Sequence, residues 1–487
     1  MNYLSIGFAA LICVLWCLYY VLPQSTRPIV LLIGSVVFYA SFGLHGFVIL
    51  LFTAVSTFVS ALLIQRRRHS KLWLCMCVAA NIGVWLSAKV LPWVTFMLAR
   101  AGNALGMEWS LSSFSIPVAM GMSYFMLQAV GYVADVYLSK ASAERSFWKY
   151  LLFLTYFPAV VQGPISRYHR LMPQLCQPHL CSFVELRQHL LTVLLGLVKK
   201  MVIADRIGFF VNYCFAEYDS LSGVVLYLGA VMYAFQLYLD FSGCVDLCRG
   251  VSGLFGVELP HNFDRPYLAR SIREFWQRWH ISLSQWLRDY VYIPLGGNRR
   301  GTLRKHLNLM VTFLVSGLWH GAGFSFFLWG ALHAFYQIVG QCTQKLRERV
   351  KTKIGIKKDS FSERLYQTVI TFHLVLFAWI FFRADSLTEG VRYIKAMFSS
   401  SGWWYLFDGS VYEMGVGQNA AIVLLIHLMA ICMVYLRTKG QKALVMGIER
   451  QHIAVRWLVY YVLIFDVVLF GVYGVGYDLS GFMYGGF

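Results

Sequence analysis

Long apolar runs recur along almost the whole chain and are separated by short polar segments. A transmembrane helix needs about 20 mainly apolar residues, and backbone polar groups inside a bilayer must be satisfied within helices or closed barrels. The runs lie at residues 3–22, 28–43, 44–64, 72–98, 115–138, 147–163, 189–216 (with a possible break), 222–241, 306–320, 323–341, 365–383, 419–436 and 456–476. They predict an all-α polytopic membrane protein with roughly 11 transmembrane helices, the shorter runs being re-entrant or amphipathic helices.

The composition excludes most soluble classes. Apolar residues make up 58% of the 487 residues and charged residues only 13%, whereas soluble domains carry about 25% charged residues. A soluble enzyme, a disordered chain and a disulfide scaffold are therefore excluded. The 11 cysteines lie mostly within apolar runs, and we interpret them as small buried hydrophobic residues.

Basic residues exceed acidic ones, 42 to 23, giving a net charge of +19. In a soluble protein this excess would suggest a nucleic-acid partner. Here the basic residues bunch between apolar runs, which indicates orientation by the positive-inside rule and contact with anionic membrane lipids. We expect no nucleic-acid partner.

Three basic clusters predict the topology: residues 66–71, 345–364 and 437–442 should be cytoplasmic. Counting from them places both termini outside the cytoplasm. Arg167 and Arg170 contradict a simple count, so we expect one run near 150–216 not to span. No internal repeat or long polar linker interrupts the chain. We therefore expect a single membrane-embedded domain over 1–487, with peripheral helices at 1–110, a core at 111–385 and C-terminal helices at 386–487.

Residues 257–305 are too polar to span and too aromatic for an ordinary loop. Apolar side chains recur there at three- and four-residue steps, at Phe275, Trp276, Trp279, Leu283, Trp286, Leu287 and Tyr290. This spacing predicts one face of an amphipathic helix, and Trp and Tyr favour the membrane–water boundary. The alternative is a surface-lying anchor helix without chemistry.

Two apolar runs over 307–335 are joined at a Trp-His-Gly turn that contains His320. An ionisable residue within a membrane segment is a functional-site hypothesis, and a buried neutral imidazole can accept a proton. His280, with Ser284 one turn later, is a second candidate. His333 lies about 220° round an ideal helix from His320 and need not face it. The alternative for each histidine is a core residue bonded to a backbone carbonyl.

Asp240 and Asp246 are the other notable acids in apolar sequence, and either could meet a His, a Ser or an Arg. His427 is interpreted as structural, and Asp466 has no evident partner. No glycine-rich phosphate loop, GxSxG or HExxH motif occurs. We expect neither a metal site nor a permanently bound cofactor.

The chain resembles the membrane-bound O-acyltransferase family, in the bacterial branch typified by alginate O-acetylation proteins. The similarity covers roughly 110–385 and rests on PVAMGMSYFMLQAVGYVADVY (117–137), YFPAVVQGPISR (156–167), DFSGCVD (240–246), NFDRPY (262–267), FWQRWHISLSQWLRDYVYIPLGGN (275–298), GLWHG (317–321) and FFRAD (381–385). The resemblance implies helices around a central channel, where a cytoplasmic acyl thioester meets an acceptor from outside. It also implies that His320 is the essential histidine and His280 a second functional one.

The remaining site residues are assigned as hypotheses. Trp319, Ser316 and the Gly321 N–H are alternative donors to a developing oxyanion. Arg278 and Arg288 would attract the phosphates of coenzyme A or of a phosphopantetheine arm, or equally contact lipid headgroups. The donor is expected to be acetyl-coenzyme A or an acyl carrier protein, bound as a substrate.

The resemblance implies a bacterial plasma-membrane enzyme that acylates a polysaccharide, directly or through a serine on an extracytoplasmic partner of the SGNH-hydrolase type. Three alternatives stay open. The cargo could be D-alanine, passed from a carrier protein to teichoic acid. The chain could instead be a transporter or flippase, or a non-catalytic scaffold of a secretion complex.

Overall fold

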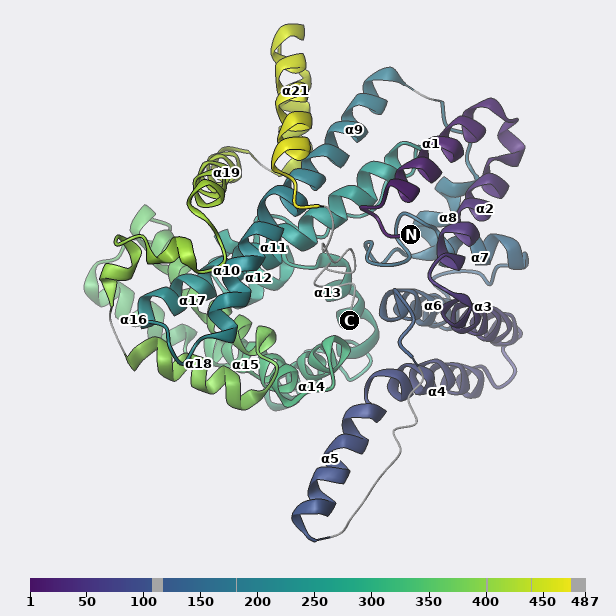
Figure 1. The fold of residues 1–487 in the computed structure, drawn as a ribbon. Coiled ribbons are helices and arrows are strands. Elements are labelled where there is room, and N and C mark those ends of the chain that lie inside the picture. The colour runs from purple at the N-terminus through teal and green to yellow at the C-terminus, as the bar shows by residue number, and fades with distance from the viewer. Residues whose placement is uncertain (107–116, 181, 400–401, 439, 474–487) are drawn as a thin grey trace. The chain divides into compact units, whose positions relative to one another are not determined.

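The computed structural model describes residues 1–106, 117–180, 182–399, 402–438 and 440–473 (Figure 1). Every regular element in these ranges is a helix, which confirms the all-α prediction. Residues 115–116, Lys439 and residues 474–476, which fall in predicted runs or basic clusters, lie outside the described part. The described residues form two compact units, 1–193 with 245–260 and 194–244 with 261–473.

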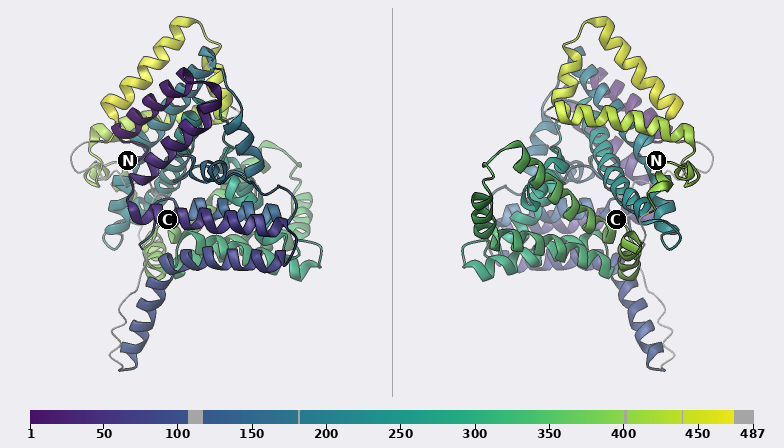
Figure 2. Two further views of the ribbon diagram at one scale, coloured as in Figure 1. Left: turned by 90° about the vertical axis from the view of Figure 1, so that its right-hand side faces the viewer. Right: turned by 90° about the vertical axis from the view of Figure 1, so that its left-hand side faces the viewer.

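The first unit contains α1 (Ile6–Val21), α2 (Arg27–Ala40), α3 (Leu44–Gln65), α4 (Ser70–Lys89), α5 (Leu91–Ala104), α6 (Met122–Tyr137), α7 (Phe147–Thr155), α8 (Tyr168–Cys176) and most of α9 (Phe183–Leu197). Helix α3 packs against α4 and α6, and α2 packs against α1 and α7 (Figures 1 and 2). A buried hydrogen bond of 2.7 Å between Thr57 Oγ1 and Tyr150 OH joins α3 to α7. The apolar runs thus form a helical core with a few satisfied polar contacts.

Two predicted runs of this unit are not single helices. Residues 72–98 form α4 and α5, because Pro92 in the first turn of α5 has no N–H group to continue the helical hydrogen bonds of α4. Residues 147–163 are helical only to Thr155. Nine helical residues extend roughly 14 Å, too little to cross a bilayer, which fits the expectation that one run near 150–216 does not span.

The second unit contains most of α11 (Gly223–Gly253) together with α10 (Asp205–Ala216), α12 (Ile272–Arg278), α13 (Ile281–Leu287), α14 (Thr302–His320), α15 (Phe324–Cys342), α16 (Gln344–Ile354), α17 (Phe361–Arg383), α18 (Leu387–Ser399), α19 (Gln418–Arg437), α20 (Gln441–Glu449) and α21 (Ile453–Phe470). The break expected within 189–216 is a π-helical segment, Val198–Ala204, between α9 and α10. Shorter helical turns lie at Gln24–Thr26, Pro266–Leu268, Arg288–Tyr292, Trp403–Leu406 and Ser410–Glu413.

Helices α14 and α15 form a tightly packed hairpin that positions the site (Figure 1). A Cβ atom on Gly317 would lie 2.4 Å from the Phe326 carbonyl oxygen, and one on Gly330 would lie 2.4 Å from the Phe313 carbonyl oxygen. Real Cβ atoms do not approach backbone that closely. The hairpin therefore requires glycine at both positions.

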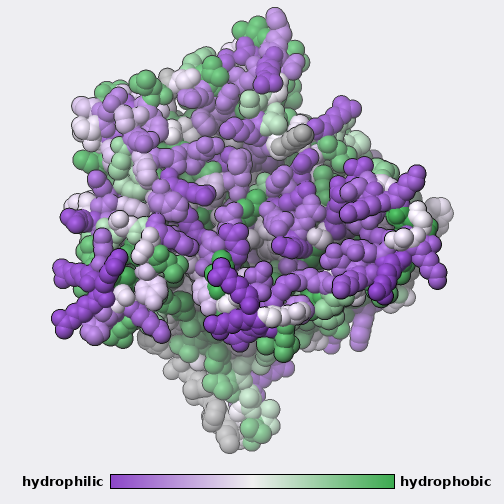
Figure 3. Space-filling model, turned by 180° about the vertical axis from the view of Figure 1, so that it is seen from behind, coloured by the Kyte–Doolittle hydropathy of each residue, from purple (hydrophilic) through white to green (hydrophobic). Residues whose placement is uncertain are grey.

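Six helices in the described residues are long and apolar enough to cross a membrane: α3, α4, α11, α17, α19 and α21. The predicted number of about 11 spans is therefore not confirmed. Helices α14 and α15 have 19 residues each, but polar residues such as Arg304, Lys305 and His333 interrupt their apolar sequence. Hydrophilic and hydrophobic side chains share the face drawn in Figure 3, as expected of a chain that meets both water and lipid.

Candidate active site

The aromatic segment after residue 270 is two short helices with a break at His280. Helix α12 ends at Arg278, α13 begins at Ile281, and His280 between them has left-handed backbone with φ 41° and ψ 55°. The prediction of one continuous amphipathic helix is therefore wrong. The apolar side chains at three- and four-residue steps are buried within the protein, and Phe275, Trp279 and Leu283 are each 1% exposed.

Asn262 stabilises this break with both of its oxygens. The Ile281 N–H donates to the Asn262 carbonyl (3.1 Å), and the Ser282 N–H donates to Asn262 Oδ1 (3.1 Å). The first N–H groups of a helix have no partner inside the helix, so Asn262 satisfies two donors of α13. The Asp264 N–H also donates to the Arg278 carbonyl (3.0 Å). The segment around Asn262 thus holds the break from both sides.

The His280 ring is buried among aromatic side chains. It is 1% exposed, and its ring centroid lies 4.8 Å from that of Phe241 and 5.9 Å from that of Trp319. Burial lowers the pKa of His280 to about 3, because an imidazolium is poorly solvated there. His280 is therefore neutral at physiological pH.

His320 is the last residue of α14 and lies in an aromatic enclosure. It is 3% exposed, and its ring lies 4.7 Å from Trp319, 5.0 Å from Trp329 and 5.0 Å from Phe382, each in an edge arrangement. His280 and His320 both contact Trp319. The structure therefore brings together the two histidines selected from the sequence, with one indole in contact with both.

Ser316 and Gly321 flank His320 in different ways. Ser316, one turn earlier on α14, is 1% exposed, and its hydroxyl has no hydrogen-bond partner among the described residues. A Cβ atom on Gly321 would lie 2.2 Å from Phe326 Cε2. The Phe326 ring therefore packs directly against Gly321. Ser316 thus keeps a buried hydroxyl available beside His320.

His333 lies closer to the site than its helical position suggested. The rings of His333 and His320 contact the same indole, Trp329, at 5.1 and 5.0 Å. Trp276 Nε1–H donates to His333 Nδ1 at 3.2 Å, so neutral His333 carries its proton on Nε2. This bond joins α12, which leads to the His280 break, to the α14–α15 hairpin. Sequence periodicity could not predict the Trp276–His333 hydrogen bond, because the bond depends on how two helices cross.

Asp240 forms an ion pair with a lysine, Lys200, that was not predicted from the sequence. Lys200, which is 1% exposed, places Nζ 2.5 Å from Asp240 Oδ1 and 2.8 Å from Asp205 Oδ1. The predicted partners were His, Ser or Arg. A lysine inside an apolar run was the available signal. Since Phe241 follows Asp240 and contacts His280, the ion pair fixes the part of α11 that lies against the site.

The two arginines predicted to attract phosphate both have acidic partners. Arg278 Nη2 lies 2.6 Å from Glu274 Oε1, and Arg288 Nε lies 3.0 Å from Asp289 Oδ1. The Arg288 side chain is 61% exposed and the Arg278 side chain 26%. Their contact with a donor stays a prediction.

The remaining predicted residues are Ser284 and Asp246. The Ser284 N–H donates to the His280 carbonyl at 3.0 Å, and Ser284 Oγ donates to the Trp279 carbonyl at 3.3 Å, on the other side of the break. Asp246 is buried in the first unit. Asp466, which had no predicted partner, bonds His427 Nε2 at 2.8 Å. No cluster of three or more His, Cys, Asp or Glu suitable for a metal occurs in the described part of the chain.

Comparison with known proteins gives a family assignment. The model of the membrane-bound O-acyltransferase family matches residues 108–383, which include His280, His320, Asn262 and Lys200. The chain is 34% identical over 394 residues to the probable alginate O-acetylase AlgI of Pseudomonas aeruginosa, covering 79% of this chain and 72% of that protein.

Two other relatives have names that state different activities. The peptidoglycan O-acetyltransferase of Helicobacter pylori is 31% identical over 401 residues, covering 76% of this chain and 74% of the relative. The teichoic acid D-alanyltransferase of Bacillus subtilis is 27% identical over 362 residues, covering 70% and 86%. The matched region and these identities show that the chain belongs to the membrane-bound O-acyltransferase family.

Proposed function

We propose that the protein is a bacterial membrane O-acetyltransferase that moves an acetyl group from a cytoplasmic thioester to a hydroxyl of a cell-surface polysaccharide. The observation that carries this proposal is the burial of His320 and His280 against the same indole, Trp319, inside the region matched by the family. The acetyl assignment is supported by the greater identity to O-acetylating relatives (34% and 31%) than to the D-alanyltransferase of Bacillus subtilis (27%).

In the proposed reaction, neutral His320 is the general base. It accepts the proton of the acceptor hydroxyl as the hydroxyl oxygen attacks the thioester carbonyl carbon. The carbon–sulfur bond then breaks, the ester forms, and the departing thiolate takes the proton from the imidazolium. A positioned base of this kind contributes ~10²–10⁴-fold to the rate.

The aromatic enclosure supports this role for His320. Three aromatic rings contact the imidazole and restrict its orientation. A low-dielectric surrounding strengthens the interaction between a donor and a developing oxyanion. Ser316 is the candidate donor that the packing favours, because its hydroxyl is buried one turn from His320 and uncommitted among the described residues.

The acceptor could receive the acetyl group directly or through an extracytoplasmic partner of the SGNH-hydrolase type. Acetyl-coenzyme A or an acylated carrier protein would supply the thioester at the cytoplasmic side. In this proposal the basic clusters at 66–71 and 345–364 face the cytoplasm and both termini face outward, in the plasma membrane.

The first test is transfer of radiolabelled acetyl from acetyl-coenzyme A by purified, detergent-solubilised protein, supplied with the polymer fraction. We expect His320→Ala to lower the transfer rate by about 10²–10⁴-fold. His306→Ala is the matched control, because His306 lies at the other end of the same helix.

Each outcome has a distinct meaning. Equal transfer by wild type and His320→Ala would remove His320 from the mechanism. Transfer only from a D-alanyl-charged carrier protein would move the assignment to D-alanylation. If His320→Ala abolishes polymer acetylation while the protein still assembles normally, the scaffold hypothesis is excluded.

A further inference from the structure

Helix α16 has the surface pattern of a helix that lies on a membrane. Leu346, Val350 and Ile354 form one row along it and are 61%, 46% and 68% exposed. The rows at about 100° to either side are basic: Lys345, Arg349 and Lys353 on one flank, Arg347 and Lys351 on the other. Gln344, Glu348 and Thr352 form the opposite, polar face.

The two basic flanks differ in their partners. Lys351 Nζ lies 2.6 Å from Glu363 Oε1, and Arg347 donates to the Gly340 carbonyl oxygen. Lys345, Arg349 and Lys353 have no ion pair among the described residues. Glu348 is the only acid on α16, and its carboxylate accepts from Gln344 Nε2 at 3.0 Å. One flank is thus engaged within the protein, and the other presents three uncompensated cations.

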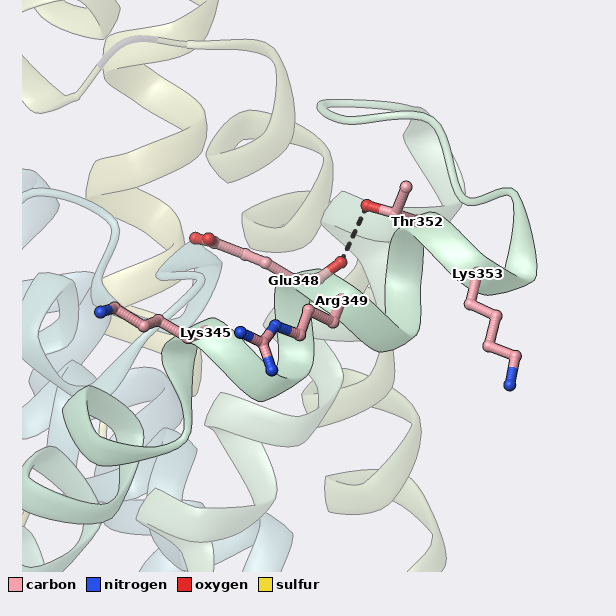
Figure 4. A pocket seen from close by; sticks show the side chains of 5 residues that line it. All are labelled: Lys345, Glu348, Arg349, Thr352 and Lys353. Carbon is pink, nitrogen blue, oxygen red and sulfur yellow. Dashed lines mark hydrogen bonds between the residues drawn. The ribbon is translucent and has the colours of Figure 1, made fainter.

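A shallow pocket follows the uncompensated flank (Figure 4). Lys345, Arg349 and Lys353 line it together with Glu348 and Thr352. Thr352 Oγ1 donates to the Glu348 carbonyl at 3.0 Å, along the helix, which leaves Glu348 as the single acidic side chain of the pocket beside three basic ones. Cationic groups therefore dominate the pocket.

The neighbouring helices hold α16 beside a membrane span. Helix α15 ends at Cys342, just before α16, and α17, one of the six candidate spans, begins at Phe361. The Lys351–Glu363 ion pair joins α16 to the first turn of α17. The Asp359 N–H also donates to Glu363 Oε2 at 2.7 Å. The connection is therefore short and pinned at the end of a spanning helix.

From this pattern we propose that α16 lies on the membrane surface, with its apolar row in the acyl-chain boundary, and that Lys345, Arg349 and Lys353 bind the phosphates of anionic phospholipids. An apolar row flanked by basic rows suits the interface, because long basic side chains reach up to the headgroups while their stems cover apolar surface. Anionic lipids attract each such cation measurably near the surface. A soluble acidic protein would match the charges, but it would not account for the exposure of the apolar residues Leu346, Val350 and Ile354.

The test is hydrogen–deuterium exchange of the full-length protein in nanodiscs, read on peptides covering residues 344–354. We compare discs of phosphatidylcholine with discs that also contain phosphatidylglycerol. Exchange in wild type should be on the order of tenfold slower in the anionic discs. Added salt should reduce this difference, because it screens exposed charges.

A triple variant, Lys345→Gln with Arg349→Gln and Lys353→Gln, should lose the difference between the two kinds of disc. The control is Arg66→Gln with Arg67→Gln and Arg68→Gln, which removes the same charge elsewhere and should keep it. Leu346→Ser with Val350→Ser should speed exchange in both discs.

Equal exchange of wild-type α16 in both kinds of disc would overturn the proposal. So would persistence of the difference in the Lys345 triple variant. If the triple variant leaves exchange unchanged but raises KM for a thioester donor, the surface serves the donor and the lipid assignment is wrong. Because the readout is exchange, failure of the acetyl-transfer function would not affect it.

Discussion

At the scale of single residues, the site depends on a strained backbone position. His280 has left-handed backbone, which costs most residues other than glycine roughly 1–2 kcal/mol. The cost is offset locally by Asn262, which accepts two N–H groups from α13. Asn262 therefore fixes the backbone that orients the His280 ring against Trp319. It does so through its bonds to the backbone of α13.

Two substitutions of Asn262 test its role in capping α13, one that removes the capping oxygen and one that keeps it. Asn262→Ala removes the side-chain oxygen that caps α13 and should destabilise the protein by about 1 kcal/mol. It should also lower acetyl transfer by about tenfold, because His280 loses its fixed backbone. Asn262→Asp keeps an oxygen acceptor at the cap and should restore most of the activity. Thermal unfolding and transfer rate are measured side by side, and a failure of Asp to rescue would contradict the capping role.

His280 also makes stability depend on pH. It lies outside the six candidate spans, and its pKa is about 3 in the folded protein against about 6.5 in an unfolded chain. Between these values only the unfolded state binds the proton, so the free energy of unfolding falls as pH drops below about 6.5. From pH 7 to pH 5 the loss due to this group should be about 2 kcal/mol.

His280→Asn removes this titration while keeping a residue that tolerates left-handed backbone. The loss of apparent Tm between pH 7 and pH 5 should therefore be smaller in His280→Asn than in wild type. His306→Asn is the control for replacing a histidine by asparagine elsewhere in the chain. An identical pH response in wild type and His280→Asn would show that the His280 environment is not as dry as its burial indicates.

At the scale of elements, the α14–α15 hairpin is set by close backbone contact. Gly317→Ala would place a Cβ atom 2.4 Å from the Phe326 carbonyl oxygen, and backbone cannot move aside cheaply. We expect a destabilisation of about 1–3 kcal/mol and a large loss of transfer, because the hairpin carries His320. Thermal unfolding in detergent and the transfer assay measure the two effects.

Gly340→Ala on α15 is the matched control for Gly317→Ala. No atom lies within 4 Å of a Cβ built on Gly340, so alanine should be tolerated or should stabilise the helix slightly. If Gly317→Ala behaves like Gly340→Ala, the hairpin is less closely packed than the structure has it.

At the scale of the whole molecule, the open prediction concerns topology, that is, which segments of the chain face the cytoplasm. The basic clusters predict that residues 66–71 and 345–364 lie on the cytoplasmic side, while the start of α3 faces outward. Single cysteines at Leu44, Arg68 and Lys357, in a background without native cysteines, test this directly. Leu44→Cys should react with an impermeant maleimide on intact spheroplasts, and Arg68→Cys and Lys357→Cys only after permeabilisation. Labelling of all three in intact cells would contradict the topology.

Local sequence patterns predicted the helical class of this protein and the two histidines of its candidate site. Hydropathy predicted an all-helical membrane protein, and three- and four-residue periodicity grouped the apolar side chains of 275–287 that the structure buries. The motifs selected His280 and His320, which prove to contact the same indole. These inferences succeed because hydropathy and helical periodicity are properties of a few neighbouring residues. The predicted number of spans is not confirmed, because several helices, such as α2 with 14 residues and α6 with 16, are shorter than the corresponding apolar runs.

The amino-acid sequence by itself determined the class of protein and the two central histidines. Only the tertiary structure decided the break at His280, the support from Asn262, the Lys200–Asp240 ion pair and the Trp276–His333 bond. The bonds involved join residues 19 to 57 positions apart. Their geometry depends on how separate helices cross and how closely they pack, and no local pattern of residues encodes that.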